Sequence, residues 1–328
     1  MGNTQDSLAI GIDVGATKIA AALITSRGQV LATQQVKTRT DLGVNSVLDQ
    51  IAELTRELSS RPIDDPILST LPILGIGIGI PGHVDTKAGI VRDAINLGWR
   101  EVHLAAGIEA RLDSKLPVWV EKDSNASTLG EFHFGAARGY RDIVYLCIGS
   151  GLGGGIIVNG SLVAGSSWQA TDLGHLSIDV DGLPCVCGLR GCVETIVSGP
   201  GLLNWVSESL AQGNNSSRLS REIELTTEAV VSAARDGDEL ALAAFLNMGR
   251  NLGIVISFCL SVLDPALIVI GGGLGLAAFD LIIPAARHEI ERRVLPSIHT
   301  NLKITPSLLA SSAVGAASLA LSQTYGND

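Results

Sequence analysis

Basic residues are the scarcer charge in this chain. The 328 residues include 23 lysines and arginines against 33 aspartates and glutamates, which gives a formal net charge of −10. This balance argues against a nucleic-acid partner, because nucleic acid is usually bound by a face rich in lysine and arginine. It does not argue against an anionic substrate, since backbone amides can bind phosphate without a net positive charge.

A basic leader and a long unbroken apolar run are also missing. Residues 1–7 are polar and contain no lysine or arginine, so no secretory signal is expected. The most apolar stretch, residues 265–286, is broken by four glycines and by Asp280. This pattern favours a buried strand, a turn and a helix over a membrane span. We therefore expect a cytoplasmic protein with no membrane partner.

Cysteine is sparse, but three of the five cysteines lie within eight positions: Cys185, Cys187 and Cys192. An odd number with one tight cluster favours a metal site in a reducing compartment over a disulfide framework. With His175 the three thiolates make a closed tetrahedral set, so we expect a structural Zn²⁺. The alternative is that reduced cysteines merely line a loop.

The length of the chain favours two domains, because it exceeds what one compact core usually holds. A pattern of strand, glycine-containing turn and further strands starts near residue 8 and again near residue 142, which indicates a structural duplication. We expect a smaller α/β domain in residues 1–122 plus 311–328 and a larger one in 123–310. With no low-complexity linker, the hinge is expected on crossing helices.

Apolar periodicity predicts the remaining elements. Helices are expected at 44–59, 101–112, 125–132, 239–263 and 313–323, and strands at 74–80, 118–120 and 266–270. The short run around Ile304 is left unassigned.

Two glycine-containing turns occupy the same place in the two copies. The first is Asp13-Val14-Gly15-Ala16-Thr17-Lys18, and the second, residues 149–155, is glycine or serine at six of seven positions. Backbone amides in such turns can hold phosphate oxygens, and an aspartate at a strand end can hold Mg²⁺ through water. The candidate phosphate residues are Asp13, Gly15, Thr17, Lys18, Gly149, Ser150 and Gly151. The alternatives are an ordinary hairpin turn and a glycine bulge.

A third glycine run, Gly271-Gly272-Gly273, follows the buried strand expected at 266–270. Such a run suits a flat adenine ring lying on the backbone, and the alternative is a plain strand-to-helix turn. No lysine follows in the order that a Walker A loop requires.

Several acids have the placement of substrate-binding groups. Asp123 lies between a short strand and a helix, where a carboxylate can take the proton of an attacking hydroxyl. Its alternative role is a helix N-cap. Asp172 and Glu194 lie close in sequence to His175 and Cys192, so a zinc loop would hold both on one wall of a sugar pocket. The alternative is that Asp172 and Glu194 are solvated surface acids.

In this order, the motifs resemble those of the ROK family of bacterial sugar kinases and repressors over nearly the whole chain. The segments that carry the resemblance are 13–18, 81–85, 96–99, 121–131, 149–155 and 174–175 with the Cys-x-Cys-Gly-x-x-Gly-Cys-x-Glu run at 185–194. The resemblance implies an α/β, actin-like hexokinase (ribonuclease H-like) fold, a duplicated ATPase with two domains around a cleft. It also implies a homodimer or homotetramer.

The resemblance further implies the roles of individual residues. Asp123 matches the catalytic base of the family. His175 matches a residue that both binds zinc and faces the sugar, which joins the metal to the pocket. The expected sugar-binding residues are Gly82, Asn96, Lys122, Asp123, Asp172, His175 and Glu194.

Two positions depart from the family pattern, and both lie on the sugar side. Lys122 stands where asparagine is usual, so a donor with a charge replaces a group that both donates and accepts. Asp172 stands where glutamate is usual, which withdraws the carboxylate by roughly 1.5 Å. The ATP side is intact, so phosphoryl transfer is better supported than the identity of its acceptor.

We expect an ATP-dependent kinase that uses Mg²⁺ and phosphorylates a hexose, with glucose the first candidate, at its 6-hydroxyl. N-acetylated hexosamines, fructose and allose are alternative acceptors, and polyphosphate is an alternative donor. A sugar-responsive DNA-binding regulator is disfavoured, because only seven residues precede the first expected strand. A catalytically inactive sugar sensor stays open as a second function, and an actin-fold ATPase of the chaperone type ranks last.

Overall fold

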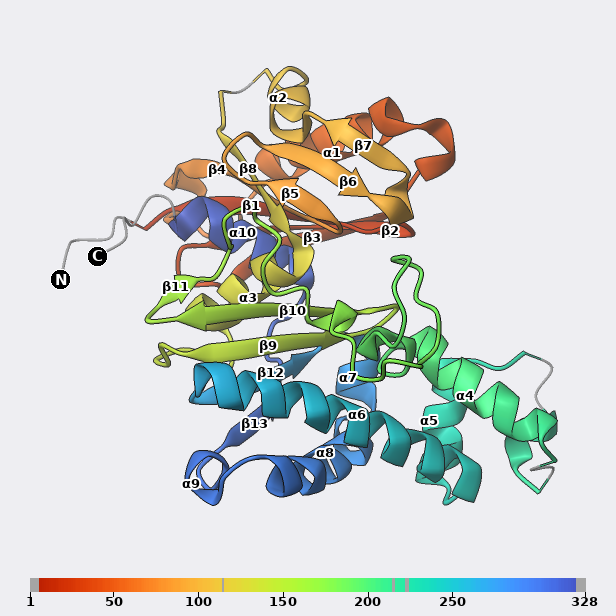
Figure 1. The fold of residues 1–328 in the computed structure, drawn as a ribbon. Coiled ribbons are helices and arrows are strands. Elements are labelled where there is room, and N and C mark those ends of the chain that lie inside the picture. The colour runs from red at the N-terminus through yellow and green to blue at the C-terminus, as the bar shows by residue number, and fades with distance from the viewer. Residues whose placement is uncertain (1–5, 114, 214–215, 222–223, 323–328) are drawn as a thin grey trace. The chain divides into compact units, whose positions relative to one another are not determined.

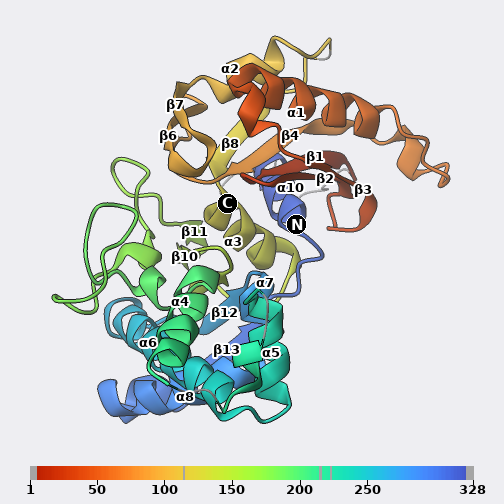
Figure 2. The same cartoon turned by 90° about the vertical axis from the view of Figure 1, so that its right-hand side faces the viewer.

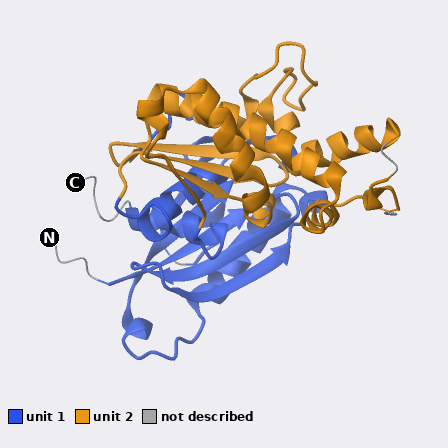
Figure 3. Ribbon diagram, turned by 90° about the horizontal axis from the view of Figure 1, so that it is seen from below, with its two compact units in different colours: residues 1–139, 162–170, 308–328 blue, residues 140–161, 171–307 orange. Residues whose placement is uncertain are grey.

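The computed structural model of the protein describes residues 6–113, 115–213, 216–221 and 224–322. The chain forms two compact units (Figure 3). The first comprises Met1–Gly139, Leu162–Ala170 and Leu308–Asp328, and the second comprises Tyr140–Ser161 and Thr171–Ser307. These packing units assign residues 123–139, 162–170 and 308–310 differently from the expected domains, and the division into domains stays a prediction.

The first unit is built on a five-stranded sheet with the order β3-β2-β1-β4-β8 (Figure 1). The strands are β1 (Leu8–Val14), β2 (Lys18–Thr25), β3 (Val30–Lys37), β4 (Ile73–Ile80) and β8 (Val118–Lys122). The first three are antiparallel neighbours, while β4 runs parallel to β1, and β8 parallel to β4. The carboxyl ends of β1, β4 and β8 therefore meet at one edge of the sheet.

Residues of β1 alternate between two apolar layers, as the period of a strand requires. Ile10 and Ile12 pack in the layer that includes α1 (Val44–Ser59), and Ala9 packs in the layer that includes α10 (Ser312–Ser322). On the α10 side a Cβ at Gly11 would lie 1.9 Å from the carbonyl oxygen of Ala313. Glycine at this position lets the helix lie directly on the strand.

Helix α3 (Asp123–Phe134) packs against α10 through small residues. A Cβ at Gly130 would lie 2.5 Å from the Cα of Gly315. A small antiparallel sheet of β5 (His83–Asp85), β6 (Ile90–Ala94) and β7 (Trp99–Val102) completes the unit, with the short helix α2 at Leu104–Glu109.

The second unit repeats the sheet of the first in strand order and in direction. Its order is β11-β10-β9-β12-β13, with β9 and β10 antiparallel and β12 and β13 parallel to β9. The strands are β9 (Ile143–Ile148), β10 (Leu152–Val158), β11 (Ser161–Leu162), β12 (Leu267–Gly271) and β13 (Lys303–Pro306). The predicted duplication and the α/β fold class are thus confirmed.

Six helices of the second unit have described bounds: α4 (Gly199–Ala211), α5 (Thr227–Arg235), α6 (Glu239–Leu263), α7 (Gly273–Ala277), α8 (Phe279–Arg293) and α9 (Pro296–His299). Helices α6 and α8 lie against each other (Figures 1 and 2). A Cβ at Gly249 of α6 would lie 2.4 Å from the carbonyl oxygen of Ile282. Among described helices, α6 alone is long and apolar enough for a membrane span by length and composition, yet half of its most apolar window is buried.

Two element predictions differ from the structure. The helix expected at 101–112 begins at Leu104, because Trp99–Val102 pairs with β6 as a strand. The unassigned run around Ile304 is β13, which pairs with β12 at the edge of the sheet.

Candidate active site

Two carboxylates meet at the edge where β1, β4 and β8 of the first unit end. Asp13 is the penultimate residue of β1, and Asp123 begins α3 directly after β8. A Cβ placed at Gly79 of β4 would lie 3.5 Å from the Cα of Asp123 and 3.7 Å from Oδ1 of Asp13. The two acids therefore lie on either side of the same glycine.

The environment of Asp13 disfavours its charge. Burial raises the pKa of its carboxyl to about 6, and the charge of Asp123 acts in the same direction. A hydrogen bond from the Ser312 hydroxyl to Oδ2 and the charge of Lys18 oppose this shift. Asp13 is thus ionised at neutral pH but poorly solvated, and a nearby cation would stabilise it.

Asp123 lies in the first turn of α3, where the helix dipole favours a negative charge. Its Oδ1 accepts a hydrogen bond from the backbone N–H of Ser124 at 2.6 Å. The N-cap residue is Lys122, so the capping alternative does not describe Asp123. Behind it, the buried Glu121 accepts from the side chain of Asn125 at 3.1 Å, and burial raises the pKa of the Glu121 carboxyl.

The first predicted phosphate turn is closed by its own backbone. The N–H of Gly15 donates to the carbonyl of Lys18 at 2.9 Å, and Thr17 and Lys18 are exposed. Thr38, the residue after β3, stabilises the turn, because its hydroxyl donates to the carbonyl of Gly15 at 2.7 Å. The sequence analysis did not identify Thr38, which lies outside any glycine motif.

Three predicted sugar-binding residues lie in the first unit. Gly82 has φ of 103°, and a Cβ there would lie 2.2 Å from the carbonyl oxygen of Asp93. Asn96 is exposed, in the 3₁₀ turn that precedes β7. Lys122 ends β8 and is half-buried beside Glu121, whose carboxylate accepts from its backbone N–H at 2.8 Å.

The second unit brings together the four predicted zinc ligands. The ligand atoms of His175, Cys185, Cys187 and Cys192 all lie within 4.8 Å of one another. The Sγ atoms of Cys187 and Cys192 are 3.7 Å apart, and Sγ of Cys185 is 3.7 Å from Nδ1 of His175. A tetrahedron with Zn–S bonds of about 2.3 Å has edges of about 3.8 Å, so the donor set fits zinc.

Glu194 and the second glycine turn are joined directly. One carboxylate oxygen of Glu194 accepts from the backbone N–H of Leu152 at 2.8 Å, immediately after Gly151. The turn is closed by a bond from the N–H of Gly149 to the carbonyl of Gly151 at 2.9 Å, and Ser150 is exposed. Glu194 therefore links the segment that carries the predicted zinc ligands, residues 175–192, to the predicted phosphate turn.

Asp172 directly precedes the 3₁₀ turn Leu173–His175 and is exposed. Its carbonyl accepts from the N–H of His175 at 3.1 Å. Thr171, the residue before it, is buried and has φ of 68°, a region that a β-branched residue rarely adopts. Backbone strain of this kind is frequent near functional sites.

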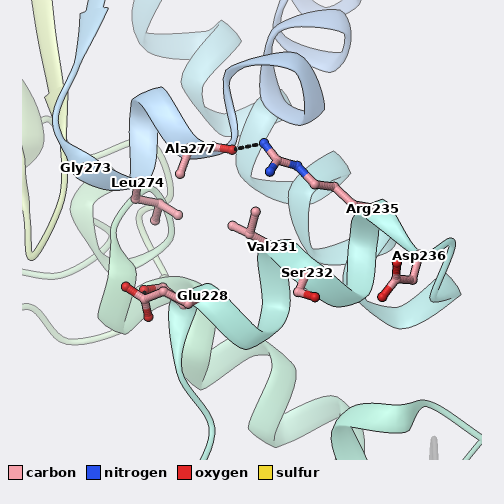
Figure 4. A pocket seen from close by; sticks show the side chains of 9 residues that line it. Glu228, Val231, Ser232, Arg235, Asp236, Gly273, Leu274 and Ala277 are labelled. Carbon is pink, nitrogen blue, oxygen red and sulfur yellow. Dashed lines mark hydrogen bonds between the residues drawn. The ribbon is translucent and has the colours of Figure 1, made fainter.

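The predicted adenine run opens onto a cavity of about 430 Å³ (Figure 4). Gly272 has φ of 81°, and Gly273 begins α7 with no atom within 4 Å of a Cβ placed there. The lining residues come from α5, its start and end, and from α7: Thr227, Glu228, Val231, Ser232, Arg235, Asp236, Gly273, Leu274 and Ala277. The α5 residues were missed by the sequence analysis, because no motif marks them.

Hydrogen bonds hold several side chains of this cavity, among them Arg235 and Glu228. Arg235 donates to the carbonyl of Ala277 at 2.8 Å and so joins α5 to α7 (Figure 4). Glu228 accepts from the hydroxyl of Thr227 at 3.0 Å, and hydrogen bonds lower the pKa of its carboxyl. Glu228 thus adds an ionised acceptor to a wall that also contains the carboxylate of Asp236 and the guanidinium of Arg235.

The repeated sheets, with acidic strand ends in one unit and glycine turns in both, define an ATPase of the actin-like hexokinase type. The chain matches the ROK family over residues 9–323. It belongs to that family.

Its relatives include enzymes and regulators. It is 33% identical over 300 residues to a glucokinase of Halalkalibacterium halodurans, covering 90% of this chain and 88% of the relative. A ROK family glucokinase from Streptomyces griseus, solved with glucose and AMPPNP, has a TM-score of 0.79 at 31% identity, covering 95% and 99% of the two chains. A ROK transcriptional regulator homologous to the E. coli MLC protein has a TM-score of 0.84 at 28% identity, covering 96% and 78%.

Proposed function

We propose that this protein transfers the γ-phosphate of ATP to the 6-hydroxyl of a hexose, with glucose as the acceptor and Asp123 as the base. The class, an ATP-dependent sugar kinase, rests on the family and on the likeness to glucokinases. The observation that carries the catalytic proposal is the pair of acids at the sheet edge, where Asp13 and Asp123 lie on either side of Gly79.

In this proposal Asp123 takes the proton from the sugar hydroxyl as its oxygen forms a bond to the γ-phosphorus. The bond between that phosphorus and the bridging oxygen breaks, and ADP leaves. Its place in the first turn of α3 puts Asp123 where the helix dipole favours a negative charge. Asp13 would hold Mg²⁺ through water, and the bound ion would offset the charge of the phosphates.

The phosphates would bind at the turns Gly15–Lys18 and Gly149–Gly151. The adenine would bind on Gly271, Gly272 and Gly273. The adjacent cavity between α5 and α7 supports a nucleoside donor, because polyphosphate has no base or ribose to occupy it. Ionised Glu228 offers an acceptor for the nucleoside's hydroxyl or amino groups.

We assign the acceptor sugar to Gly82, Asn96 and Lys122 from the first unit and to Asp172, His175 and Glu194 from the second. Lys122 brings a cation next to the base and can only donate to sugar hydroxyls. Because Lys122 stands where the family usually has asparagine, a different acceptor is an alternative to glucose: an N-acetylated hexosamine, fructose or allose. An inactive sugar sensor is the alternative function.

We also propose a structural Zn²⁺ on His175, Cys185, Cys187 and Cys192, supported by the tetrahedral spacing of their ligand atoms. The reduced thiols that this site requires fit a cytoplasmic location.

The partner that we propose is a second copy of the chain, bound along α6. Leu246, Phe258 and Val262 on this helix are 44%, 48% and 80% exposed, at spacings of four and its multiples. A two-fold axis beside Ile254 would pair Arg250 of one copy with Phe258 of the other, a cation against a ring, and Leu246 with Val262. Light scattering of Phe258→Glu tests this pairing, because the variant should be monomeric if the proposal holds.

The function is tested by an assay of coupled ATP consumption against a panel of hexoses and N-acetylhexosamines, repeated with polyphosphate as donor. Turnover with glucose and ATP is the expected result. Turnover with another sugar of the panel would correct the acceptor alone. No turnover with any sugar, with sugar still bound in calorimetry, would favour the sensor.

A further inference from the structure

Ser312, the first residue of α10, makes a contact that the catalytic proposal does not use. Its hydroxyl donates to Oδ2 of Asp13, a residue 299 positions away in the chain. The other carboxylate oxygen, Oδ1, is the one that lies 3.7 Å from the Cβ position of Gly79, on the side of Asp123. The two oxygens of Asp13 are therefore distinguished by their surroundings.

The position of Ser312 is fixed by the packing of its helix. The next residue, Ala313, places its carbonyl oxygen 1.9 Å from a Cβ position at Gly11 of β1. One turn further along α10, the carbonyl oxygen of Ala316 lies 1.9 Å from the Cβ position of Gly77 of β4. Since α10 rests directly on the two strands that carry Asp13 and Gly79, its first side chain is held at the end of β1.

We propose that Ser312 is a positioning residue for phosphoryl transfer, which fixes one oxygen of Asp13 and so aims the other at the magnesium–nucleotide complex. The inference rests on the proposed function, in which Asp13 holds Mg²⁺ through water. A hydrogen bond to a carboxylate restricts its rotation and is stronger than one between neutral groups. Without it, the repulsion between Asp13 and Asp123 would favour a carboxylate turned away from the site.

The chain provides a matched control one residue away. Ser311 has a buried hydroxyl oxygen with no hydrogen-bond partner in the part of the chain that the structure describes. Ser311→Ala and Ser312→Ala therefore remove the same atom from adjacent positions, and only the second removes a bond to Asp13. Ser312→Thr retains the hydroxyl and should rescue the property that Ser312→Ala loses.

The test is calorimetric titration of AMPPNP into wild type and the three variants, with Mg²⁺ and with EDTA, together with thermal melting. We expect Ser312→Ala to bind AMPPNP about 10- to 100-fold more weakly with Mg²⁺. Its affinity in EDTA and its melting temperature should match those of Ser311→Ala. Ser312→Thr should lie within about threefold of wild type, because the charge-assisted bond remains.

Three outcomes would overturn the inference. They are equal Mg²⁺-dependent affinities for Ser312→Ala and Ser311→Ala, a loss of the same size in EDTA, and a wild-type affinity that does not respond to Mg²⁺. None of these readouts needs a sugar. A wild-type protein that binds AMPPNP with Mg²⁺ but phosphorylates no sugar would contradict the proposed function, while the comparison of variants would still decide the role of Ser312.

Discussion

Burial of Asp13 destabilises the folded protein when the carboxyl is charged, yet the proposed function requires that charge. The pKa of this carboxyl is about 6 in the folded protein against an ordinary value of 3.8. The folded state therefore holds this proton more tightly than the unfolded chain does. Its contribution to stability is present in full below the ordinary pKa and is lost as pH rises through the folded one.

Asp13→Asn should therefore stabilise the protein at neutral pH while weakening Mg²⁺-dependent nucleotide binding. We expect the free energy of unfolding to rise by about 1–2 kcal/mol at pH 7, and the gain to shrink towards pH 4. Urea unfolding of both proteins at the two pH values measures this. A gain of the same size at both would show that the charge of Asp13 is not its cause.

Residue contacts that are local in sequence could be predicted, and distant ones could not. Asp13 and Asp123 were identified because each lies at the end of a strand within a short motif. Ser312 was not, because its bond to Asp13 joins the two ends of the chain. The same is true of buried Glu131, whose carboxylate accepts from the backbone of Leu308, 177 positions away, at 3.1 Å.

Helix α6 ends at a residue that is poorly suited to its position. Asp264 caps the helix with φ of 47° and ψ of 54°, a left-handed conformation that favours glycine. Its negative charge also lies at the negative end of the helix dipole. Asp264→Gly should raise the free energy of unfolding by about 0.5–1 kcal/mol. Asp264→Ala removes the charge but not the strain, so a gain as large as that of glycine would contradict this explanation.

The segment that carries the proposed zinc ligands, residues 175–192, is the element whose stability should depend most on a ligand. Cys187→Ser removes one of four ligands from a site without an open position, so we expect zinc content to fall from about one per chain to near zero. Amide exchange in residues 176–192 should accelerate at the same time. Cys147→Ser, outside the cluster, is the control, and zinc retained by Cys187→Ser would refute the ligand set.

Among the helices and strands, the sequence predicted those whose buried residues follow a clear apolar pattern. Buried strands such as β4 and β12 were found because their apolar runs are continuous. The edge strand β13 was not, since all four of its residues are exposed or only half-buried, and its last, Pro306, is a residue that strands seldom contain. The pocket-lining helix α5 was not anticipated. Thr226 caps it, but no chemical motif marks the residues that face the pocket.

At the scale of the whole molecule, the duplication explains why the predicted binding residues are divided between the two units. Each unit has a glycine-containing turn after its first strand. The acids Asp13 and Asp123 belong to one unit, while the proposed zinc ligands belong to the other. The duplication was visible in the sequence because the hairpin turns recur. The identity of the sugar was not visible, because it depends on the positions of single side chains, which neither the duplication nor the periodicity of the sequence determines.

The central claim is that Asp123 is the base of a sugar kinase, and Asp123→Asn tests it most directly. The variant should keep its glucose affinity in calorimetry within about threefold, since asparagine still offers polar atoms to the sugar. Its kcat should fall by about 10²- to 10⁴-fold, because asparagine cannot accept the proton. A kcat near that of the wild type, with glucose still bound, would contradict the account.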